Sequence, residues 1–311
     1  MFFTTDPDWT RRCDAAAEEI LSRFAPQGLT EDRFGLVALR DTGDTPVGYA
    51  RNGDWHCYPC SVVKVFHLVH VLNALEAGRV APHHDLDRAM HDMIAWSSNT
   101  ATNYIIDLVT GTTGDTRLEP EDFALWRERR EGLNRFFAAL GWPEWQGCNI
   151  TQKLMDDTRY GREAQYAGAD SSYLNVLTPL TAARMFHELF AGDLPLGAEA
   201  RARAQEILLR DRQSDKARQP HFQVSDYLGG GVPEAATIWS KAGRNSWTGD
   251  ARASYYKHDL IRIALPGEAP VILSLMTQGK GICEDHPEIF PEMARILCGH
   301  LIGTRAVSHC E

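Results

Sequence analysis

The chain has 311 residues, of which 43% are hydrophobic and 24% are charged. This composition is that of a globular protein with a substantial core, and it excludes a disordered, collagenous or coiled-coil chain. The 42 acidic residues outnumber the 32 basic ones, so nucleic acid is not expected as the main partner. No stretch reaches the roughly 20 apolar residues of a membrane helix, so no membrane partner is expected either.

The chain starts with MFFTTDPDWTRR, which does not resemble a signal peptide, because it has acids at Asp6 and Asp8 and no basic end followed by an apolar core. The seven cysteines are scattered and odd in number. Together these features favour free thiols in a reducing compartment, and we expect a cytoplasmic protein.

The CYPC run places Cys57 and Cys60 at the spacing of a redox or zinc motif, but a zinc site would need a second pair that the chain lacks. We therefore interpret both as incidental thiols and expect no metal. We also expect them to be unbridged, because Cys57 ends a predicted strand and Cys60 begins a predicted helix.

The amino-terminal part predicts one helix and a hairpin. Apolar residues recur at helical spacing over residues 17–24, before a proline and a glycine end the pattern. Residues 34–40 read as a buried strand, and residues 47–57 read as a second strand after a short polar turn. Two strands joined in this way form an antiparallel pair.

From Ser61 the pattern becomes helical and stays so to about residue 215. A long apolar helix ends at Gly78, and residues 127–142 form an amphipathic pattern. Thr178 followed by Pro179 predicts the N-cap and first position of another helix. The polar stretch 148–177 is too long for an ordinary connection, so we expect a functional loop there.

Strands return after residue 235, and a helix ends the pattern. The predicted strands cover residues 237–243, 251–258, 260–265 and 270–279, and the predicted helix covers residues 288–302. Because the two β regions bracket the helices, we expect an α/β fold in which they join in one antiparallel sheet, with an all-α insert. We expect one catalytic unit over residues 1–311, with an α/β subdomain (1–60 plus 235–311) and an all-α subdomain (61–234).

Three short motifs carry the chemistry. Ser61 and Lys64 form S-x-x-K at a helix start, which places both side chains on one face, one turn apart. A serine needs a nearby base to act as a nucleophile, and a lysine of lowered pKa can serve. The motif alone is common. It is followed, however, by Ser97-Ser98-Asn99 and then by Lys241-Ala242-Gly243.

In this order the motifs resemble those of the serine β-lactamase and penicillin-binding protein superfamily, whose elements are S-x-x-K, S-x-N and K-[ST]-G. SSNTATN is similar to the S-D-N-T-A-A-N of class A β-lactamases, and the resemblance covers about residues 10–305. It implies a five-stranded antiparallel sheet with terminal helices and an all-α insert.

The resemblance also implies roles for individual residues. Ser61 is the acylated nucleophile and Lys64 its base or proton relay. Ser97 passes a proton to the leaving group, helped by Lys241. Asn99 binds a substrate amide carbonyl and touches Lys64.

The same resemblance implies an oxyanion hole made by the backbone N–H groups of Ser61 and Arg244. Gly243, just before Arg244, lets the edge strand approach the substrate closely. No cofactor is expected.

The sequence departs from the family pattern at several positions. Ala242 replaces a hydroxyl residue that helps hold a substrate carboxylate. Arg252 is a candidate replacement, expected on the neighbouring strand. The glutamate pattern of the class A deacylation base, E-x-x-x-N, is absent from the loop. Glu163, sixteen residues before Pro179, is the remaining candidate for that base.

We therefore expect a serine hydrolase that forms an acyl-enzyme with a small-molecule β-lactam, amide or ester. Two alternatives stay open: a cytoplasmic acyltransferase or esterase of a biosynthetic pathway, and a non-catalytic binding or sensor module that is acylated once. The absent glutamate favours the sensor, whereas the retained motif residues favour an enzyme. The sequence indicates neither the physiological substrate nor the oligomeric state.

Overall fold

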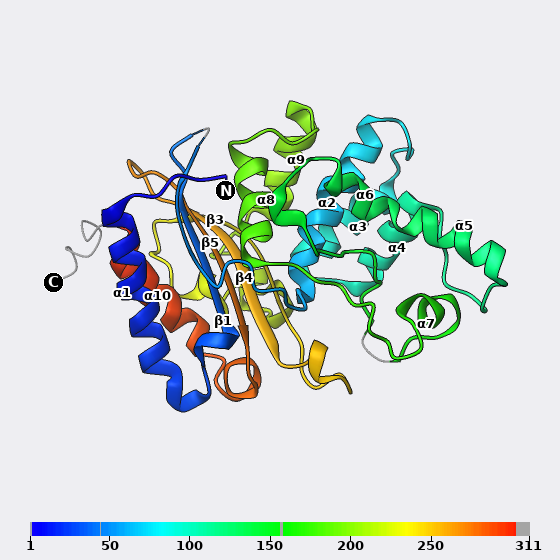
Figure 1. Cartoon of the computed structure of the whole chain (residues 1–311). Helices are drawn as coiled ribbons and strands as arrows, with labels where there is room; N and C mark the ends of the chain where they lie inside the picture. The colour runs from blue at the N-terminus through cyan, green and yellow to red at the C-terminus, as the bar shows by residue number, and fades with distance from the viewer. Residues whose placement is uncertain (1, 44, 156–157, 303–311) are drawn as a thin grey trace.

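The computed structural model describes residues 2–43, 45–155 and 158–302 of the chain (Figure 1). A five-stranded sheet with the order β2-β1-β5-β4-β3 lies at its centre, and all neighbouring strands are antiparallel. This confirms the predicted fold class. The strands are β1 (Phe34–Arg40), β2 (Val47–Arg51), β3 (Thr237–Arg244), β4 (Tyr256–Ala264) and β5 (Val271–Gln278).

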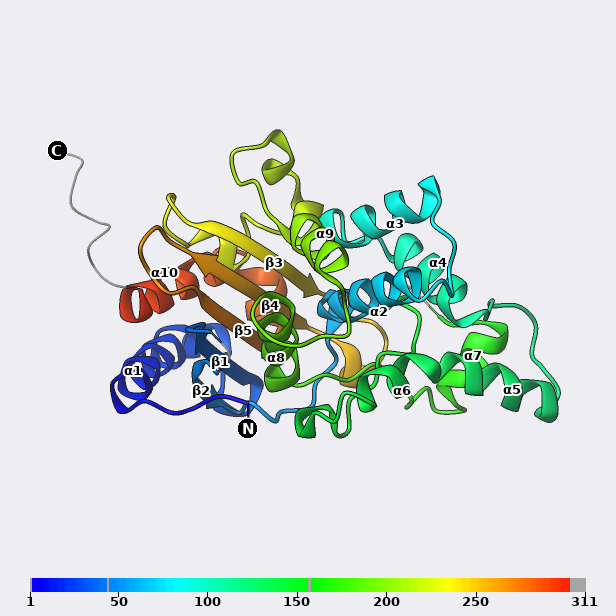
Figure 2. The ribbon, with the colours of Figure 1, turned by 90° about the horizontal axis from the view of Figure 1, so that it is seen from above.

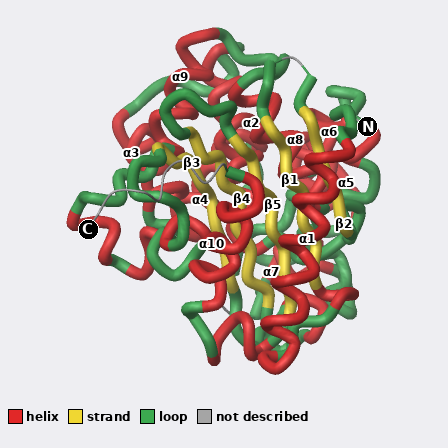
Figure 3. Tube along the Cα trace, turned by 90° about the vertical axis from the view of Figure 1, so that its left-hand side faces the viewer, coloured by secondary structure: helices red, strands yellow, loops and turns green. Residues whose placement is uncertain are grey.

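Helices cover both faces of the sheet, which explains why β1, β4 and β5 are buried almost throughout. The helices α1 (Pro7–Phe24) and α10 (Ile289–Leu301) lie side by side on one face (Figures 2 and 3). On the other face α8 (Pro179–Phe190) packs against β5 and β1. The apolar core is accordingly divided into two clusters, one on each side of the sheet.

The remaining helices lie beyond α8, on the side away from α1 and α10 (Figure 2). They are α2 (Lys64–Glu76), α3 (His84–Ala95), α4 (Asn99–Thr110), α5 (Pro120–Arg130), α6 (Gly132–Ala138), α7 (Gly161–Ala167) and α9 (Ala198–Leu208). Within the described ranges no helix combines the length and apolar character needed to cross a membrane.

Most predicted elements are present, with local differences. The cap of α8 is as predicted, because the Thr178 side chain accepts a hydrogen bond from the Thr181 N–H. The predicted helix over residues 127–142 is two helices, α5 and α6, which meet at Glu131. The loop 148–177 is irregular except for α7.

The predicted strand over residues 251–258 was wrong in its first half. Residues Ala251–Ala253 form a short 3-10 turn, and the strand starts at Tyr256 and continues through the next predicted strand as β4. The Asp250 side chain caps this turn by accepting the Arg252 N–H, which holds these residues in a turn instead of a strand.

Candidate active site

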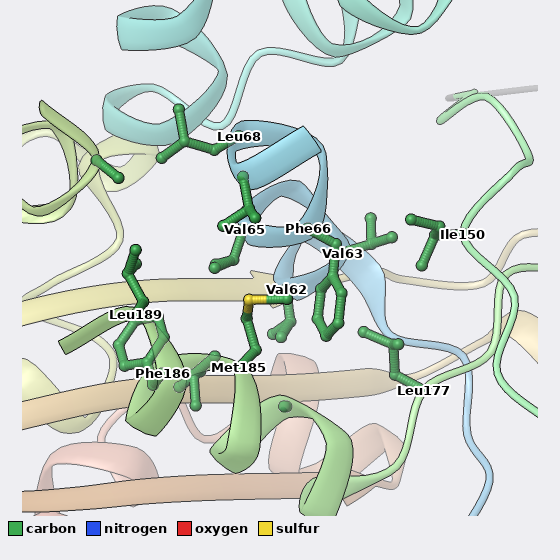
Figure 4. Packing of buried hydrophobic residues seen from close by; sticks show 14 of the residues in the cluster. Val62, Val63, Val65, Phe66, Leu68, Ile150, Leu177, Met185, Phe186 and Leu189 are labelled. Atoms are coloured by element: carbon green, nitrogen blue, oxygen red, sulfur yellow. The ribbon is translucent and has the colours of Figure 1, made fainter. Parts of the chain in front are cut away.

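Ser61 lies in a 3-10 turn (Cys60–Val63) that leads directly into α2. The turn and helix are fixed by apolar residues packed against α8 and the loop before it, as Figure 4 shows. The labelled residues of this core are Val62, Val63, Val65, Phe66, Leu68, Ile150, Leu177, Met185, Phe186 and Leu189. The nucleophile candidate therefore sits at the start of a rigid helix, where free backbone N–H groups favour negative charge.

Lys64 is fully buried and joins the first two motifs. Its Nζ donates to the Ser97 carbonyl, lies 3.3 Å from Ser97 Oγ, and donates to Asn99 Oδ1 at 2.9 Å. The contact between Lys64 and Asn99 is the one that the family resemblance implies. Asn99 opens α4, and Ser98 caps that helix by accepting the Ala101 N–H at 3.1 Å.

Lys241 brings the third motif to the same point. Its Nζ donates to Ser97 Oγ at 3.0 Å, and also to Gln223 Oε1 and the Ala242 carbonyl. The Ser97 hydroxyl thus lies between two buried lysines. A hydroxyl accepts two hydrogen bonds and donates one, so Ser97 keeps a proton to give.

Gly243 places strand β3 against the nucleophile. A Cβ atom on Gly243 would lie 2.3 Å from the Ser61 backbone nitrogen, so any side chain there would clash with the chain at Ser61. The exposed Arg244 follows at the end of β3. This approach brings the two residues of the predicted oxyanion hole, Ser61 and Arg244, to neighbouring segments.

Two non-glycine residues within or next to the first two motifs have left-handed backbone angles. Cys60, just before Ser61, has φ 47°, and Ser97 has φ 55°. Such angles cost free energy and persist only where the surroundings enforce them, which is typical of active sites.

The electrostatics of the site favour loss of a proton from the lysine pair. Burial lowers the pKa of Lys241 well below its ordinary value, and the neighbouring charges of Lys64 and Arg210 lower it further. Asp259 acts in the opposite direction on Lys241. A neutral amine beside a serine is a candidate base.

Asp259 itself gives a prediction about pH. Burial raises the pKa of its carboxyl to about 7 from an ordinary value of 3.8. Between these values the folded protein keeps a proton that the unfolded chain has lost, so this group's contribution to stability falls as pH rises from about 4 to 7. Asp259→Asn should remove this fall and stabilise the protein above pH 7 by up to about 4 kcal/mol.

Chemical denaturation between pH 4 and 8 measures this effect. Asp259→Asn keeps an acceptor for the Leu228 N–H, which now binds Asp259 Oδ2 at 3.0 Å. Asp285→Asn, an equal charge change at an exposed position, is the control. An Asp259→Asn protein with the same pH slope as the unaltered protein would show that Asp259 is ionised in the fold.

Glu163 lies in α7, and its carboxylate forms a buried ion pair. Its carboxylate binds the fully buried Arg130 through both oxygens, at 2.8 and 3.0 Å, and lies 3.5 Å from Lys153 Nζ. These contacts with Arg130 and Lys153 favour a structural role for Glu163 over that of a water-activating base.

Arg252 is not on a neighbouring strand, as the sequence suggested, but in the turn before β4. Its guanidinium binds both carboxylate oxygens of Asp250 and donates to the Asp170 carbonyl at 2.9 Å. It therefore connects the β3–β4 turn to the long loop, and its charge is paired with Asp250.

Two residues of the site were not found from the sequence. Gln223, with φ 57°, binds Lys241 from a turn in the polar stretch before β3. The buried Arg210 donates to the Ser240 carbonyl of β3 and to the Ile94 carbonyl of α3, three residues before Ser97. It fixes the position of Ser97 relative to β3. Neither residue belongs to a recognisable motif.

The cysteines and helix histidines behave as structural residues. All six cysteines in the described ranges are free, which confirms the prediction for Cys57 and Cys60; Cys310 lies outside these ranges. Burial raises the pKa of both the Cys57 and the Cys60 thiols, so neither is an activated thiolate. Burial likewise lowers the pKa of His67 to about 3 and of His70 to about 4. The described residues contain no cluster of potential metal ligands.

Solved structures similar to this one are β-lactamases, at low sequence identity. A β-lactamase from Xanthomonas campestris pv. campestris has a TM-score of 0.63 and 17% identity, over 93% of this chain and 98% of the other. One from Burkholderia vietnamiensis has a TM-score of 0.61 and 16% identity, over 91% and 94%. The reconstructed last common ancestor of class A β-lactamases of Gram-negative bacteria has a TM-score of 0.60 and 17% identity, over 91% and 98%. These likenesses concern the fold.

Among curated proteins no sequence matches this chain. The model of the β-lactamase enzyme family matches residues 84–301. That range includes Ser97, Asn99 and Lys241, whereas Ser61 and Lys64 precede it and are tied to the site by the contacts described above. Because the match covers more than two thirds of the sequence, the chain belongs to the β-lactamase enzyme family.

Proposed function

We propose that the protein hydrolyses a small β-lactam, amide or ester through an acyl-enzyme on Ser61. The observation that carries this proposal is the Ser97 hydroxyl held between two buried lysines, 3.3 Å from Lys64 and 3.0 Å from Lys241. This arrangement supplies a base and a proton donor beside a serine at a helix start.

In the first half-reaction Ser61 Oγ attacks the acyl carbon while Lys64 takes the hydroxyl proton. The oxyanion accepts hydrogen bonds from the backbone N–H groups of Ser61 and Arg244, which the close packing of Gly243 supports. The bond to the leaving group then breaks, and that group takes the proton of Ser97, which Lys64 replaces through its contact with Ser97 Oγ. Asn99 orients both Lys64 and the substrate amide.

In the second half-reaction water attacks the acyl carbon, releases the acid and restores Ser61. A well-placed general base contributes about 10²–10⁴-fold to such a step. The side chain of Asn103, on α4, binds the backbone of Leu154 in the long loop. It donates to the Leu154 carbonyl and accepts the Leu154 N–H. Glu163 is held by Arg130. We therefore expect release of the acyl group to be slower than its formation, most of all for penicillins, while simple esters turn over measurably.

Intact-protein mass spectrometry after incubation with a penicillin and with an activated ester tests this proposal. We expect a mass increase equal to the acyl group, located by peptide mapping to Ser61, which decays over time. If no adduct forms with either class, or if the adduct maps to another residue, the proposed function is wrong.

A slowly released acyl group would also suit an acyltransferase or a sensor. The ion pair of Glu163 with Arg130 favours these alternatives over a fast hydrolase. The decay of the adduct separates them: added amines or alcohols accelerate it in a transferase, and it does not decay at all in a sensor.

A further inference from the structure

A cavity of about 620 Å³ lies between the long loop and the β3–β4 turn. Met155, parts of residues 158–174 and the turn 248–253 contribute its walls, together with Tyr58. Two parts of the cavity wall are joined to the site along the chain. Tyr58 is three residues before Ser61, and the β3–β4 turn follows Arg244 at the end of β3. A substrate bound at Ser61 thus has this cavity beside it.

Most charges around the cavity are already paired. Arg252 binds Asp250 through Nε and Nη2 and is fixed to the Asp170 carbonyl at 2.9 Å. The Asp170 carboxylate is exposed to solvent and accepts the Ser172 N–H at 3.1 Å. Solvent screens the remaining charge of Asp170.

Arg159 differs from these groups. It lines the same cavity, and its Nε is shielded from solvent without any hydrogen-bond partner. Among the residues that the structure describes, no hydrogen bond engages its guanidinium. Its charge acts on the Asp250 carboxylate without a hydrogen bond, and that carboxylate is already bound by Arg252. An unsatisfied donor that is shielded from water destabilises a fold, so its presence in a polar cavity beside a nucleophile points to a ligand.

The chemistry of this group selects the ligand. A guanidinium matches a carboxylate with two parallel hydrogen bonds, better than any neutral acceptor. The usual anion-binding hydroxyl of the third motif is replaced here by Ala242, which is fully buried. Arg159 therefore offers a substrate carboxylate a cationic partner on the loop side of the nucleophile, in addition to the exposed Arg244 at the end of β3.

We propose that the cavity binds the acyl part of the substrate and that Arg159 recognises a carboxylate at the far end of that part. The substrate class is then an amide or ester of a dicarboxylic acid. The assignment of the acyl part rests on the proposed function, whereas carboxylate binding by Arg159 can be measured without turnover.

Calorimetric titration of the non-reacting Ser61→Ala protein is the direct test. The probes are the mono-N-methylamide of glutaric acid and N-methylpentanamide, which share a five-carbon chain and differ by the terminal carboxylate. We expect the carboxylate to tighten binding by about 10- to 100-fold, the range of a hydrogen bond to a charged group. Adding Arg159→Gln to this protein should abolish the difference, and adding Arg159→Lys should restore part of it.

Arg129→Gln is the matched control, because it removes the same charge from an exposed position on α5 that does not line the cavity. It should leave the preference intact. Equal binding of the two probes, or a preference that survives Arg159→Gln, would overturn the proposal. Failure of the proposed function has a different signature: the carboxylate preference is present, but Ser61 of the unaltered protein is acylated by no ester or β-lactam.

Discussion

Replacing Ser61 by alanine is expected to lower the rate of hydrolysis of an activated ester by about 10⁴–10⁶-fold, because loss of the nucleophile removes the covalent route altogether. Binding should persist, since the hydrogen bonds of Ser97 with Lys64 and Lys241 do not involve the Ser61 side chain. Stopped-flow measurement gives the rate of ester hydrolysis, and mass spectrometry gives the amount of adduct on the protein.

Ser98→Ala is a matched control for this substitution. Ser98 lies beside the motif residues, but its hydroxyl caps α4 by accepting the Ala101 N–H. Its loss should cost about 1 kcal/mol of stability and little activity. Were Ser61→Ala to retain hydrolysis at a rate close to that of the Ser98→Ala protein, Ser61 would not be the nucleophile.

The sequence was informative wherever one motif carries both structure and chemistry. Ser61, Ser97 and Lys241 lie far apart along the chain, yet their order predicted that they converge, and Ser97 does contact both Lys64 and Lys241. The antiparallel sheet followed from β-rich runs on both sides of a helical block, because such runs can bury their apolar faces only by pairing.

The sequence was less informative where a long-range contact decides the outcome. Glu163 is bound by Arg130, thirty-three residues away, and nothing in the local pattern indicates that pair. Gln223, whose backbone is left-handed with φ 57°, binds Lys241 from eighteen residues away, and no local pattern indicates that contact. Arg252 was assigned to a strand because it lies in a β-rich run that follows the strand of Lys241, whereas the Asp250 cap makes that segment a turn.

Glu163→Gln should lower stability strongly and leave the release of the acyl group unchanged. Removing one partner of a buried ion pair leaves the other charge uncompensated, at a cost of about 3–5 kcal/mol. Here that partner is the fully buried Arg130, and its remaining carboxylate, Asp107, lies farther away, at 3.7 Å. For a chain of this length the unfolding midpoint should fall by roughly 5–8 °C. Differential scanning calorimetry measures the first effect, and decay of the adduct on Ser61 measures the second.

Glu163→Asp keeps the negative charge and therefore distinguishes a structural role of Glu163 from a catalytic one. An aspartate retains the pairing with Arg130 in part, so stability should recover toward that of the unaltered protein. A catalytic carboxylate withdrawn by one methylene would instead lose its position beside the water, and release would slow by about 10²-fold or more. Unchanged release in both variants leaves the water to be activated by Lys64 or by a base outside the long loop. Slow release in both, with stability restored in Glu163→Asp, would make Glu163 the base despite its ion pair.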